Sequence, residues 1–324
     1  MKTYRIPHSD RDVSRIAYGC MNLGGRWDHS PVTEDERRVA REAIRTALET
    51  GINLFDHADI YTHGKSETLF GEVLKATPGL RDSIVLQSKC GIRFPGEPHP
   101  GNPQRYDFSY EHILRSVEGS LRRLQTDYLD ILLLHRPDPL VEPEEVARAF
   151  DELQVSGKVR YFGVSNHTAG QIELLHRFVR QPLVINQVEL SLTHAYLIGE
   201  GILANQTGAT TALASGTLDY CRAAGILVQA WAPLAGGRLF NQDESRDVAL
   251  TRTSELISKL AAEKQTSPEG IMLAWLLRHP AGFQPIIGTT RPDRIKASCL
   301  ADEVSLSREE WYALFISARG EALP

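Results

Sequence analysis

The sequence predicts an α/β fold, a (β/α)8 TIM barrel built from parallel strands in a single domain. Apolar, strand-like runs alternate with helical stretches along nearly the whole chain, a pattern typical of parallel sheets covered by helices. Several of these runs end in a polar residue, and the strand ends are where barrel enzymes keep their chemistry. A doubly wound sheet is the structural alternative, but no junction carries its Gly-x-Gly-x-x-Gly turn. The barrel is therefore preferred.

The repeated unit is a strand followed by a helix, and roughly eight units are expected. Strands are expected at 16–25, around Asp56, and at 84–91, 128–135, 159–166, 184–190, 226–231 and 285–288. Helices are expected at 34–50, from 66 onwards, and at 110–124, 144–155, 217–224, 253–264 and 268–278, with others starting after 290 and 307. Capping boxes open the helices that follow Thr33, Thr168 and Ser307. Because no linker or composition break divides the 324 residues, the whole chain 1–324 is interpreted as one domain.

Two stretches are longer than most connections in α/β proteins, and both are expected at the catalytic mouth of the barrel. Residues 92–109 are rich in Pro and Gly and contain Arg93 and Phe94, which are candidate substrate contacts or simply tie the loop down. Residues 193–216 are rich in Ala, Thr and Gly. They predict either a flap over cofactor or substrate, or a disordered insertion. Trp27, just after the first strand, is a candidate for the substrate-pocket wall or for plain packing.

Four polar residues stand at or just beyond strand ends: Asp56, Tyr61, Lys89 and His135. Successive side chains of a strand point to opposite faces, so Asp56, Lys89 and His135 each share a face with apolar residues of their own strand. If these strands are neighbours in a parallel sheet, the polar side chains converge at one mouth. Alone, Asp56 with Lys89 would equally suit a buried structural ion pair.

Together, the four side chains suit protonation of a carbonyl oxygen. A free phenol has a pKa of about 10, and a nearby ammonium group favours the phenolate, so Lys89 is expected to lower the pKa of Tyr61 and make it a usable proton donor. Asp56 is expected to hold Lys89 charged and in place. His135 is expected to hydrogen-bond a substrate oxygen.

Composition and charge exclude several classes of function. Lys and Arg total 36 against 41 Asp and Glu, and the net charge of −5 argues against a general nucleic-acid or anionic-membrane binder. The four cysteines form no Cys-x-x-Cys pair, so neither a zinc knuckle nor a redox dithiol is indicated, and a reduced cytoplasmic setting fits best. The N-terminus lacks the apolar core of a signal peptide, and no run is long enough to span a bilayer.

Seven motifs follow one another between Gly19 and Arg294: FDHADIY, SKCG, LLLHRPD, GVSNH, INQVEL, WAPLAGG and IIGTTRPDRI. In this order they resemble the aldo-keto reductase family, and the short loops are most similar to its bacterial branch with abbreviated tails. The resemblance implies reduction of a small-molecule aldehyde or ketone by a nicotinamide cofactor, or alcohol oxidation in reverse. It also implies that Tyr61 is the general acid, that Lys89 and Asp56 tune it and that His135 orients the carbonyl, with no metal.

A hydride donor is needed, because the four polar residues supply only protons and orientation. Ser165, Asn166 and Gln187 offer hydroxyl and amide groups suited to a carboxamide. By the resemblance they hold the nicotinamide amide, and Trp231 stacks on its ring. The small residues after Trp231 resemble the family's pyrophosphate loop, because they let backbone N–H groups approach a phosphate. That loop comprises Ala232, Pro233, Leu234, Gly236, Gly237 and Arg238.

A second phosphate site is expected after the last strand, where a helix N-terminus and two guanidinium groups come together. Its residues are Gly288, Thr289, Thr290, Arg291 and Arg294. By the resemblance this is the place of the adenosine 2′-phosphate, so NADPH is preferred over NADH. The family often continues with a Glu-Asn pair that contacts adenine, whereas this chain has Ala297 and Ser298.

Two alternatives come from other functional classes. The first is a nucleotide-binding regulatory subunit of the same fold with little or no turnover, like the potassium-channel beta subunits of this superfamily. Turnover of simple aldehydes distinguishes it from an enzyme. The second is a metal-dependent hydrolase or isomerase, which needs clustered His and carboxylate ligands at strand ends. Only His135 and Asp56 are suitably placed, and Lys89 beside them would repel a cation.

Overall fold

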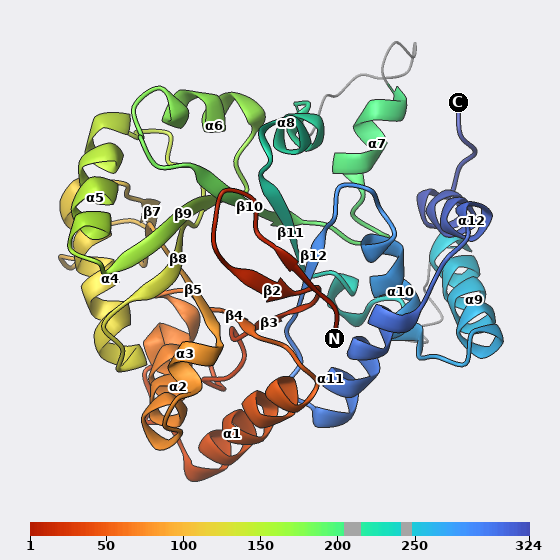
Figure 1. The fold of residues 1–324 in the computed structure, drawn as a ribbon, viewed down its shortest axis with the longest axis horizontal. Coiled ribbons are helices and arrows are strands. Elements are labelled where there is room, and N and C mark those ends of the chain that lie inside the picture. The colour runs from red at the N-terminus through yellow and green to blue at the C-terminus, as the bar shows by residue number, and fades with distance from the viewer. Residues whose placement is uncertain (204–214, 241–247) are drawn as a thin grey trace.

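The computed structural model describes residues 1–203, 215–240 and 248–324, and it shows a closed barrel of eight strands surrounded by helices (Figure 1). Each strand pairs in parallel with the next barrel strand along the chain, and the last pairs with the first. The strands are β3 (Ala17–Gly19), β4 (Leu54–Asp56), β5 (Val85–Cys90), β8 (Leu129–Leu134), β9 (Val159–Ser165), β10 (Leu183–Glu189), β11 (Leu227–Trp231) and β12 (Gln284–Ile287). The predicted (β/α)8 barrel is confirmed.

Helices follow every barrel strand and form the outer layer (Figure 1). The α-helices are α1 (Glu34–Glu49), α2 (Lys65–Ala76), α3 (Leu80–Ser83), α4 (Tyr110–Leu124), α5 (Pro143–Val155), α6 (Ala169–His176), α7 (Tyr196–Leu203), α8 (Thr217–Ala224), α9 (Val248–Glu263), α10 (Pro268–Leu277), α11 (Pro292–Cys299) and α12 (Arg308–Arg319). Short 3₁₀ turns are η1 (Tyr61–Gly64), η2 (Ala235–Gly237) and η3 (Leu300–Glu303). The capping boxes predicted at Thr33, Thr168 and Ser307 are all present. None of the helices described is long and apolar enough to cross a membrane.

Inward-facing apolar side chains fill the barrel below its mouth, which we define as the end where the parallel strands terminate. Strand residues of this layer are almost fully buried and belong to one cluster: Ala17, Leu54, Val85, Ile131, Leu133, Ile185, Leu227 and Ile286. The alternate residues face outward and pack against the helices in a second, larger cluster. This division follows from the two-residue period of a strand. Asp56 and Lys89 continue the inward-facing rows of β4 and β5 toward the mouth.

An N-terminal hairpin, which the sequence did not predict, covers the opposite end of the barrel. Strands β1 (Thr3–Arg5) and β2 (Asp12–Ser14) pair antiparallel, and the hairpin lies over the middle of the barrel in Figure 1. Ile6 and Val13 are fully buried and join the inner apolar cluster. The hairpin thus closes the end of the barrel opposite the mouth.

The first barrel strand is shorter than expected. Residues 16–25 were predicted as strand, but β3 ends at Gly19. The N–H of Cys20 still bonds to the Asp56 carbonyl at 2.8 Å, after which the chain turns, with Leu23 bonding back to Cys20. The apolar run therefore continues beyond the sheet as a buried turn, and its residues reach the rim of the mouth.

The two long connections differ from one another. Residues 92–109 contain a small antiparallel hairpin, formed by β6 (Ile92–Arg93) and β7 (Arg105–Tyr106). Within 193–216 the structure describes helix α7. Residues 204–214 of the expected flap or insertion lie outside the described residues.

Candidate active site

A chain of three side chains lies at the mouth of the barrel. The Lys89 ammonium donates to Asp56 Oδ2 at 2.8 Å, to the His57 carbonyl at 2.8 Å and to the Tyr61 phenol oxygen at 2.9 Å. All three of its N–H bonds are thereby used, and its side chain is 0% exposed. Because the Tyr61 oxygen accepts from Lys89, its own O–H proton remains available to a group in the cleft that Tyr61 lines. The structure brings these residues together as the sequence predicted.

The turn that presents Tyr61 is conformationally strained. Thr62, His63 and Gly64 have φ angles of 48°, 56° and 84°, and a β-branched residue such as Thr rarely adopts a positive φ. Thr62 Oγ1 lies 2.9 Å from Ser66 Oγ and accepts from the Ser66 N–H at 3.1 Å, which fixes the turn to the start of α2. A side chain at Gly24 would come within 1.9 Å of Thr62 Oγ1, so glycine is required there. These contacts hold the phenol over the barrel end.

The expected direction of the Tyr61 pKa shift is wrong. Desolvation by burial raises the pKa of Tyr61, and the opposing effect of the Lys89 charge does not offset it. Desolvation also lowers the pKa of Lys89, but Asp56 and Tyr61 together outweigh that effect and raise it. The sequence argument considered the charge of Lys89 and could not know how deeply the phenol is buried. At neutral pH Tyr61 therefore keeps its proton, the form that a general acid needs, beside a charged Lys89.

His135 faces Tyr61 across the mouth as a neutral imidazole. Burial, followed by the charges of Lys89 and Arg136, lowers its pKa well below the ordinary value. The two rings meet edge to face with centroids 5.9 Å apart, and His135 lines the cleft. A neutral imidazole has one N–H to donate, so His135 is placed to hydrogen-bond an oxygen near the phenol. Trp27 also lines the cleft, with its ring 6.4 Å from that of Tyr61.

Four buried glutamines, of which the sequence analysis singled out only Gln187, form a network beneath Asp56. Gln87 and Gln187 donate to Asp56 Oδ1 at 2.5 and 3.1 Å, and to Gln229 Oε1 at 2.9 and 3.0 Å. Gln229 donates in turn to Gln87 and Gln284, and Gln284 donates to the Ser14 carbonyl in the N-terminal hairpin. Each residue of this glutamine network is at most 2% exposed. The network connects the Asp56 carboxylate to the closed end of the barrel.

A cleft of about 680 Å³ opens at the mouth and contains most of the predicted site. Of the four predicted catalytic residues Asp56, Tyr61 and His135 line it, and Lys89 lies behind them. The predicted cofactor residues that line it are Ser165, Asn166, Gln187, Trp231, Ala232, Pro233, Leu234, Gly236, Gly237, Gly288, Thr289 and Arg294. Residues lining it that the sequence analysis did not propose include Met21, Asn22, Arg136, Phe240, Glu269 and Ser298. Chain segments from β3 to α11 therefore meet around one cleft.

The donor set of the cleft fits a nicotinamide nucleotide. Trp231 offers an indole face at the mouth, and Asn166 and Ser165 hydrogen-bond each other beside it at 2.9 Å. At Gly236 and Gly288 nothing lies within 4 Å of the position a Cβ would take, so the backbone is open to a phosphate there. Ser298, further along the chain in α11, also lines the cleft, and its buried hydroxyl has no hydrogen-bond partner.

Several predicted contacts lie elsewhere. Arg291 bonds Asp293 Oδ2 at 2.6 Å, with its side chain 61% exposed, and does not line the cleft, because a carboxylate two residues away captures its guanidinium. Arg238 and Thr290 also lie outside the lining. Arg93 is paired with Asp107 at 2.5 Å. It ties down the 92–109 connection, which was the second of its two expected roles.

Phe94 is likewise absent from the cleft lining, because its ring packs against His63 with centroids 4.6 Å apart. Of the three candidate substrate contacts, the structure therefore places only Trp27 at the cleft.

A buried ionic cluster lies outside the barrel wall, between β5 and the helices α2 and α4. Glu67 accepts from Ser88 Oγ at 2.7 Å and from Arg123 at 2.8 Å. Asp59 lies close enough to interact with it, and burial followed by the Glu67 charge raises the pKa of Asp59 to about 7. The Asp59 N–H bonds to the Lys89 carbonyl at 3.0 Å. Because Asp59 belongs to the loop between Asp56 and Tyr61, the cluster fixes this loop against the outer face of the barrel wall.

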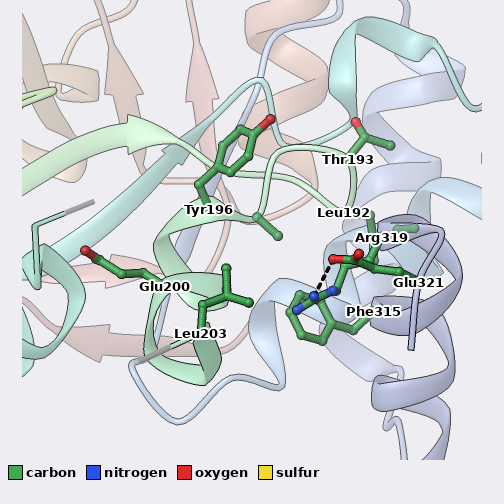
Figure 2. A pocket seen from close by; sticks show the side chains of 11 residues that line it. Leu192, Thr193, Tyr196, Glu200, Leu203, Phe315, Arg319 and Glu321 are labelled. Carbon is green, nitrogen blue, oxygen red and sulfur yellow. Dashed lines mark hydrogen bonds and ion pairs between the residues drawn. The ribbon is translucent and has the colours of Figure 1, made fainter. Parts of the chain in front are cut away.

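A second, smaller cavity of about 260 Å³ lies between α7 and α12 (Figure 2). Its charged groups are Glu200, Arg319 and Glu321, and Arg319 is already paired with Glu321 at 2.6 Å, as the dashed line in Figure 2 marks. Among the described residues, no group of three or more His, Cys, Asp or Glu is arranged to hold a metal ion.

A parallel barrel with a Tyr, Lys and Asp chain at its mouth, beside a glycine-lined cleft, has the architecture of a barrel oxidoreductase. The family model described as the aldo/keto reductase family matches residues 15–315, and the chain belongs to the aldo-keto reductase family.

Relatives found by sequence and by structure agree with this membership. The chain is 39% identical over 317 residues to the uncharacterized oxidoreductase YcsN of Bacillus subtilis, covering 97% of both chains. It is 37% identical over 319 residues to the 6-dehydroglucose reductase of Agrobacterium fabrum, covering 98% of both. Among solved structures, an aldo/keto reductase from Klebsiella pneumoniae in complex with NADP and acetate matches with a TM-score of 0.73 and 28% identity, covering 97% of this chain and 94% of that one.

Proposed function

We propose that the protein is an NADPH-dependent carbonyl reductase in which Tyr61 acts as general acid. The observation that carries this proposal is the chain from Asp56 through Lys89 to Tyr61, with both hydrogen bonds at 2.9 Å or less, opening on a cleft of about 680 Å³. A bound reduced nicotinamide supplies the hydride that the protein's own side chains cannot. The same site, run in reverse, oxidises an alcohol.

Each polar residue has a separate task in this proposal. Tyr61 donates its phenol proton to the carbonyl oxygen, and Lys89 stabilises the phenolate that remains. Asp56 and the glutamine network keep the ammonium fixed below the phenol. The neutral His135 donates a hydrogen bond to the same oxygen and so orients the carbonyl.

The cofactor assignment draws on the remainder of the cleft. Ser165, Asn166 and Gln187 are assigned to the carboxamide, and Trp231 to the nicotinamide ring. Gln187 uses both amide protons within the glutamine network, so its Oε1 is the atom left for the ligand.

The preference for NADPH over NADH draws on Arg294, which lines the cleft near the start of α11, where a phosphate is favoured. A solved relative with bound NADP supports the same choice. Arg291 is proposed only as a secondary contact, because Asp293 holds it away from the cleft.

For the substrate we propose a small aldehyde or ketone, with a sugar aldehyde as the first choice. The Agrobacterium relative is named a 6-dehydroglucose reductase. Tyr61, His135 and Trp27 leave an open, mixed polar and aromatic surface that suits a small polyhydroxylated carbonyl compound.

The test is consumption of NADPH or NADH by the purified protein with a panel of aldehydes and ketones that includes 6-dehydroglucose. We expect substrate-dependent NADPH oxidation that falls by about two to four orders of magnitude in Tyr61→Phe, since general acid catalysis is worth about that much. Nucleotide binding should persist in the variant. If the wild type binds NADPH but reduces nothing in the panel, the regulatory-subunit alternative replaces the reductase; if it binds neither nucleotide, the cofactor assignment is wrong.

A further inference from the structure

The cleft divides into two halves according to the strands that carry its lining residues. The groups assigned to the cofactor belong to β9, β10, β11 and β12 and to the segments that follow them, and these strands are consecutive in the barrel. The other half is carried by β3, β4, β5 and β8, which are also consecutive. Because the nucleotide occupies the first half in the proposed function, the second half is left to the substrate. We call it the substrate half, and its lining residues include Trp27, Ile60, Tyr61, Ile92, His135 and Arg136.

The substrate half carries a positive charge that nothing in the described chain neutralises. Asp56 lines this half, but its carboxylate is bonded to the Lys89 ammonium at 2.8 Å, so this pair adds no net charge. Arg136, two residues beyond the end of β8, is half-buried and lines the cleft. It has no hydrogen bond or ion pair with any part of the chain that the structure describes. The guanidinium of Arg136 is therefore available to an anionic ligand.

A contact with Trp231 does not use up this guanidinium. The central carbon of the Arg136 guanidinium lies 5.6 Å from the centroid of the Trp231 ring, within the range of a cation–π contact. Such a contact is an attraction between the charge and the ring face, and it supplies no hydrogen-bond acceptor in the ring plane of the guanidinium. It fixes the side chain where the two halves of the cleft meet, and it leaves the N–H donors to a ligand.

The barrel topology separates Arg136 from the phosphate site assigned at α11. Three strands separate β8 from β12 in either direction, namely β9, β10 and β11 one way and β3, β4 and β5 the other, so the two strands lie on opposite sides of the barrel. Arg294 follows β12, whereas Arg136 follows β8. Arg136 instead acts on His135: after burial and the Lys89 charge, its charge lowers the pKa of that imidazole. The guanidinium thus lies near the reacting carbonyl.

We propose that Arg136 binds an anionic group of the substrate, and that this substrate is a carbonyl compound carrying a carboxylate, such as the open-chain aldehyde of a sugar acid. A guanidinium binds a carboxylate through parallel N–H bonds. A single guanidinium offsets one negative charge, so a carboxylate fits better than a phosphate monoester, which carries nearly two. Tyr61 and His135 bind the carbonyl oxygen while Arg136 binds the carboxylate. This inference rests on the proposed function and adds the substrate class to it.

The test compares aldehyde acids with their own methyl esters, which lack the charge. The pairs are succinic semialdehyde with its methyl ester and para-carboxybenzaldehyde with its methyl ester, so that two separations of aldehyde and carboxylate are covered. NADPH oxidation gives kcat and KM for each compound. In at least one pair, wild type should favour the acid by about ten- to a hundredfold in kcat/KM, the range expected for hydrogen bonding to a charged group.

Variants of Arg136 assign this preference to its guanidinium. Arg136→Met should raise the KM for the favoured acid by about the same ten- to hundredfold and leave its kcat and both constants of the ester nearly unchanged. Arg136→Lys should keep part of the preference, because it retains the charge and loses the paired N–H geometry. The matched control is Arg122→Met, which removes an exposed guanidinium from α4 and should change none of these constants. Thermal unfolding checks that each variant is folded.

The other outcomes separate this inference from the proposed function. Equal kcat/KM for acid and ester in both pairs overturns the inference and leaves the reductase standing, as does turnover of other aldehydes but of neither acid. A preference for the acid that survives in Arg136→Met also overturns it. So does a higher dissociation constant for NADPH in Arg136→Met with equal losses for acid and ester, because Arg136 then only supports Trp231. If wild type reduces no aldehyde at all, the proposed function fails, and the inference with it.

Discussion

The indole N–H of Trp231 donates to the side-chain carbonyl of Asn166 at 3.0 Å. Asn166 has a φ of 61°, and its amide nitrogen donates to Ser165 Oγ at 2.9 Å and to the His135 carbonyl at 3.3 Å. The aromatic platform and the amide group beside it are therefore fixed by one another. A phenylalanine at this position would keep the flat surface but leave the Asn166 oxygen without its donor.

Replacing Trp231 should separate stacking from this hydrogen bond. We expect Trp231→Leu to raise the dissociation constant for NADPH by about tenfold, because an aromatic stack contributes about 1 kcal/mol beyond its buried area. Trp231→Phe should raise it by about threefold, through the loss of order at Asn166 alone. Calorimetry measures both constants. Trp27→Leu is the control, since Trp27 lies against Tyr61 and should change the KM for the carbonyl compound only. An equal loss in both Trp231 variants would contradict the role given to stacking, and an unchanged constant in Trp231→Phe would contradict the role given to the hydrogen bond.

Removing the Lys89 charge should harm both turnover and stability. In Lys89→Met the Asp56 carboxylate stays buried without its partner, which destabilises the fold by about 3–5 kcal/mol. Turnover should fall by about two to four orders of magnitude, because the phenolate of Tyr61 loses its stabilising charge. Urea unfolding and NADPH oxidation report the two effects.

The double variant Asp56→Asn/Lys89→Met distinguishes the two roles of this pair. It should regain most of the lost stability, since no unpaired charge is buried, while turnover stays low. Recovery of turnover together with stability would falsify the assignment of Lys89 to the chemical step.

The glutamine network should contribute strongly to the free energy of unfolding. Gln229→Leu leaves donors on Gln87 and Gln187 and the Gln284 oxygen without a partner in a fully buried place. Each unsatisfied group costs about 1–3 kcal/mol, so we expect the free energy of unfolding to fall by about 3 kcal/mol or more. The matched control is Gln104→Leu, at an exposed position, which should change it little. Equal unfolding midpoints for the two variants would show that the network adds nothing to stability.

The barrel and its mouth were predictable because strand periodicity places Asp56, Lys89 and His135 on inward-facing rows. Gln229 and Gln284, which the sequence analysis did not single out, also lie inside apolar runs, and a polar residue in such a row needs a partner. Their partners depend on which residues face one another across the barrel, which the closed pairing of the strands decides. That information is absent from any single strand.

Three further features could not be predicted from the local sequence. The β1–β2 hairpin consists of two three-residue strands, which are too short for a periodic signal. The guanidinium of Arg291 pairs with the carboxylate of Asp293, and the sequence alone does not show whether Arg291 binds this carboxylate or a phosphate. The raised pKa of Tyr61 follows from burial, which is known only once the chain is folded.

The buried carboxyl of Asp59 should make stability fall as pH rises. Its pKa is raised from 3.8 to about 7, so between these values the folded protein holds a proton that the unfolded chain has released. The free energy of unfolding therefore decreases with pH across this window, by on the order of 4 kcal/mol from this group. Asp59→Asn cannot release a proton and removes that decrease.

We therefore expect the stability of Asp59→Asn relative to wild type to improve steadily from pH 4 to pH 7 and to level off above it. Urea unfolding at pH 5, 6, 7 and 8 measures the difference, which does not depend on the other groups that titrate in both proteins. Asp82→Asn, an exposed substitution on α3, is the control and should give a difference that is flat with pH. A flat difference for Asp59→Asn as well would mean that Asp59 is already ionised at low pH. The charges of Glu67 and Arg123 would then balance around it differently from the arrangement described.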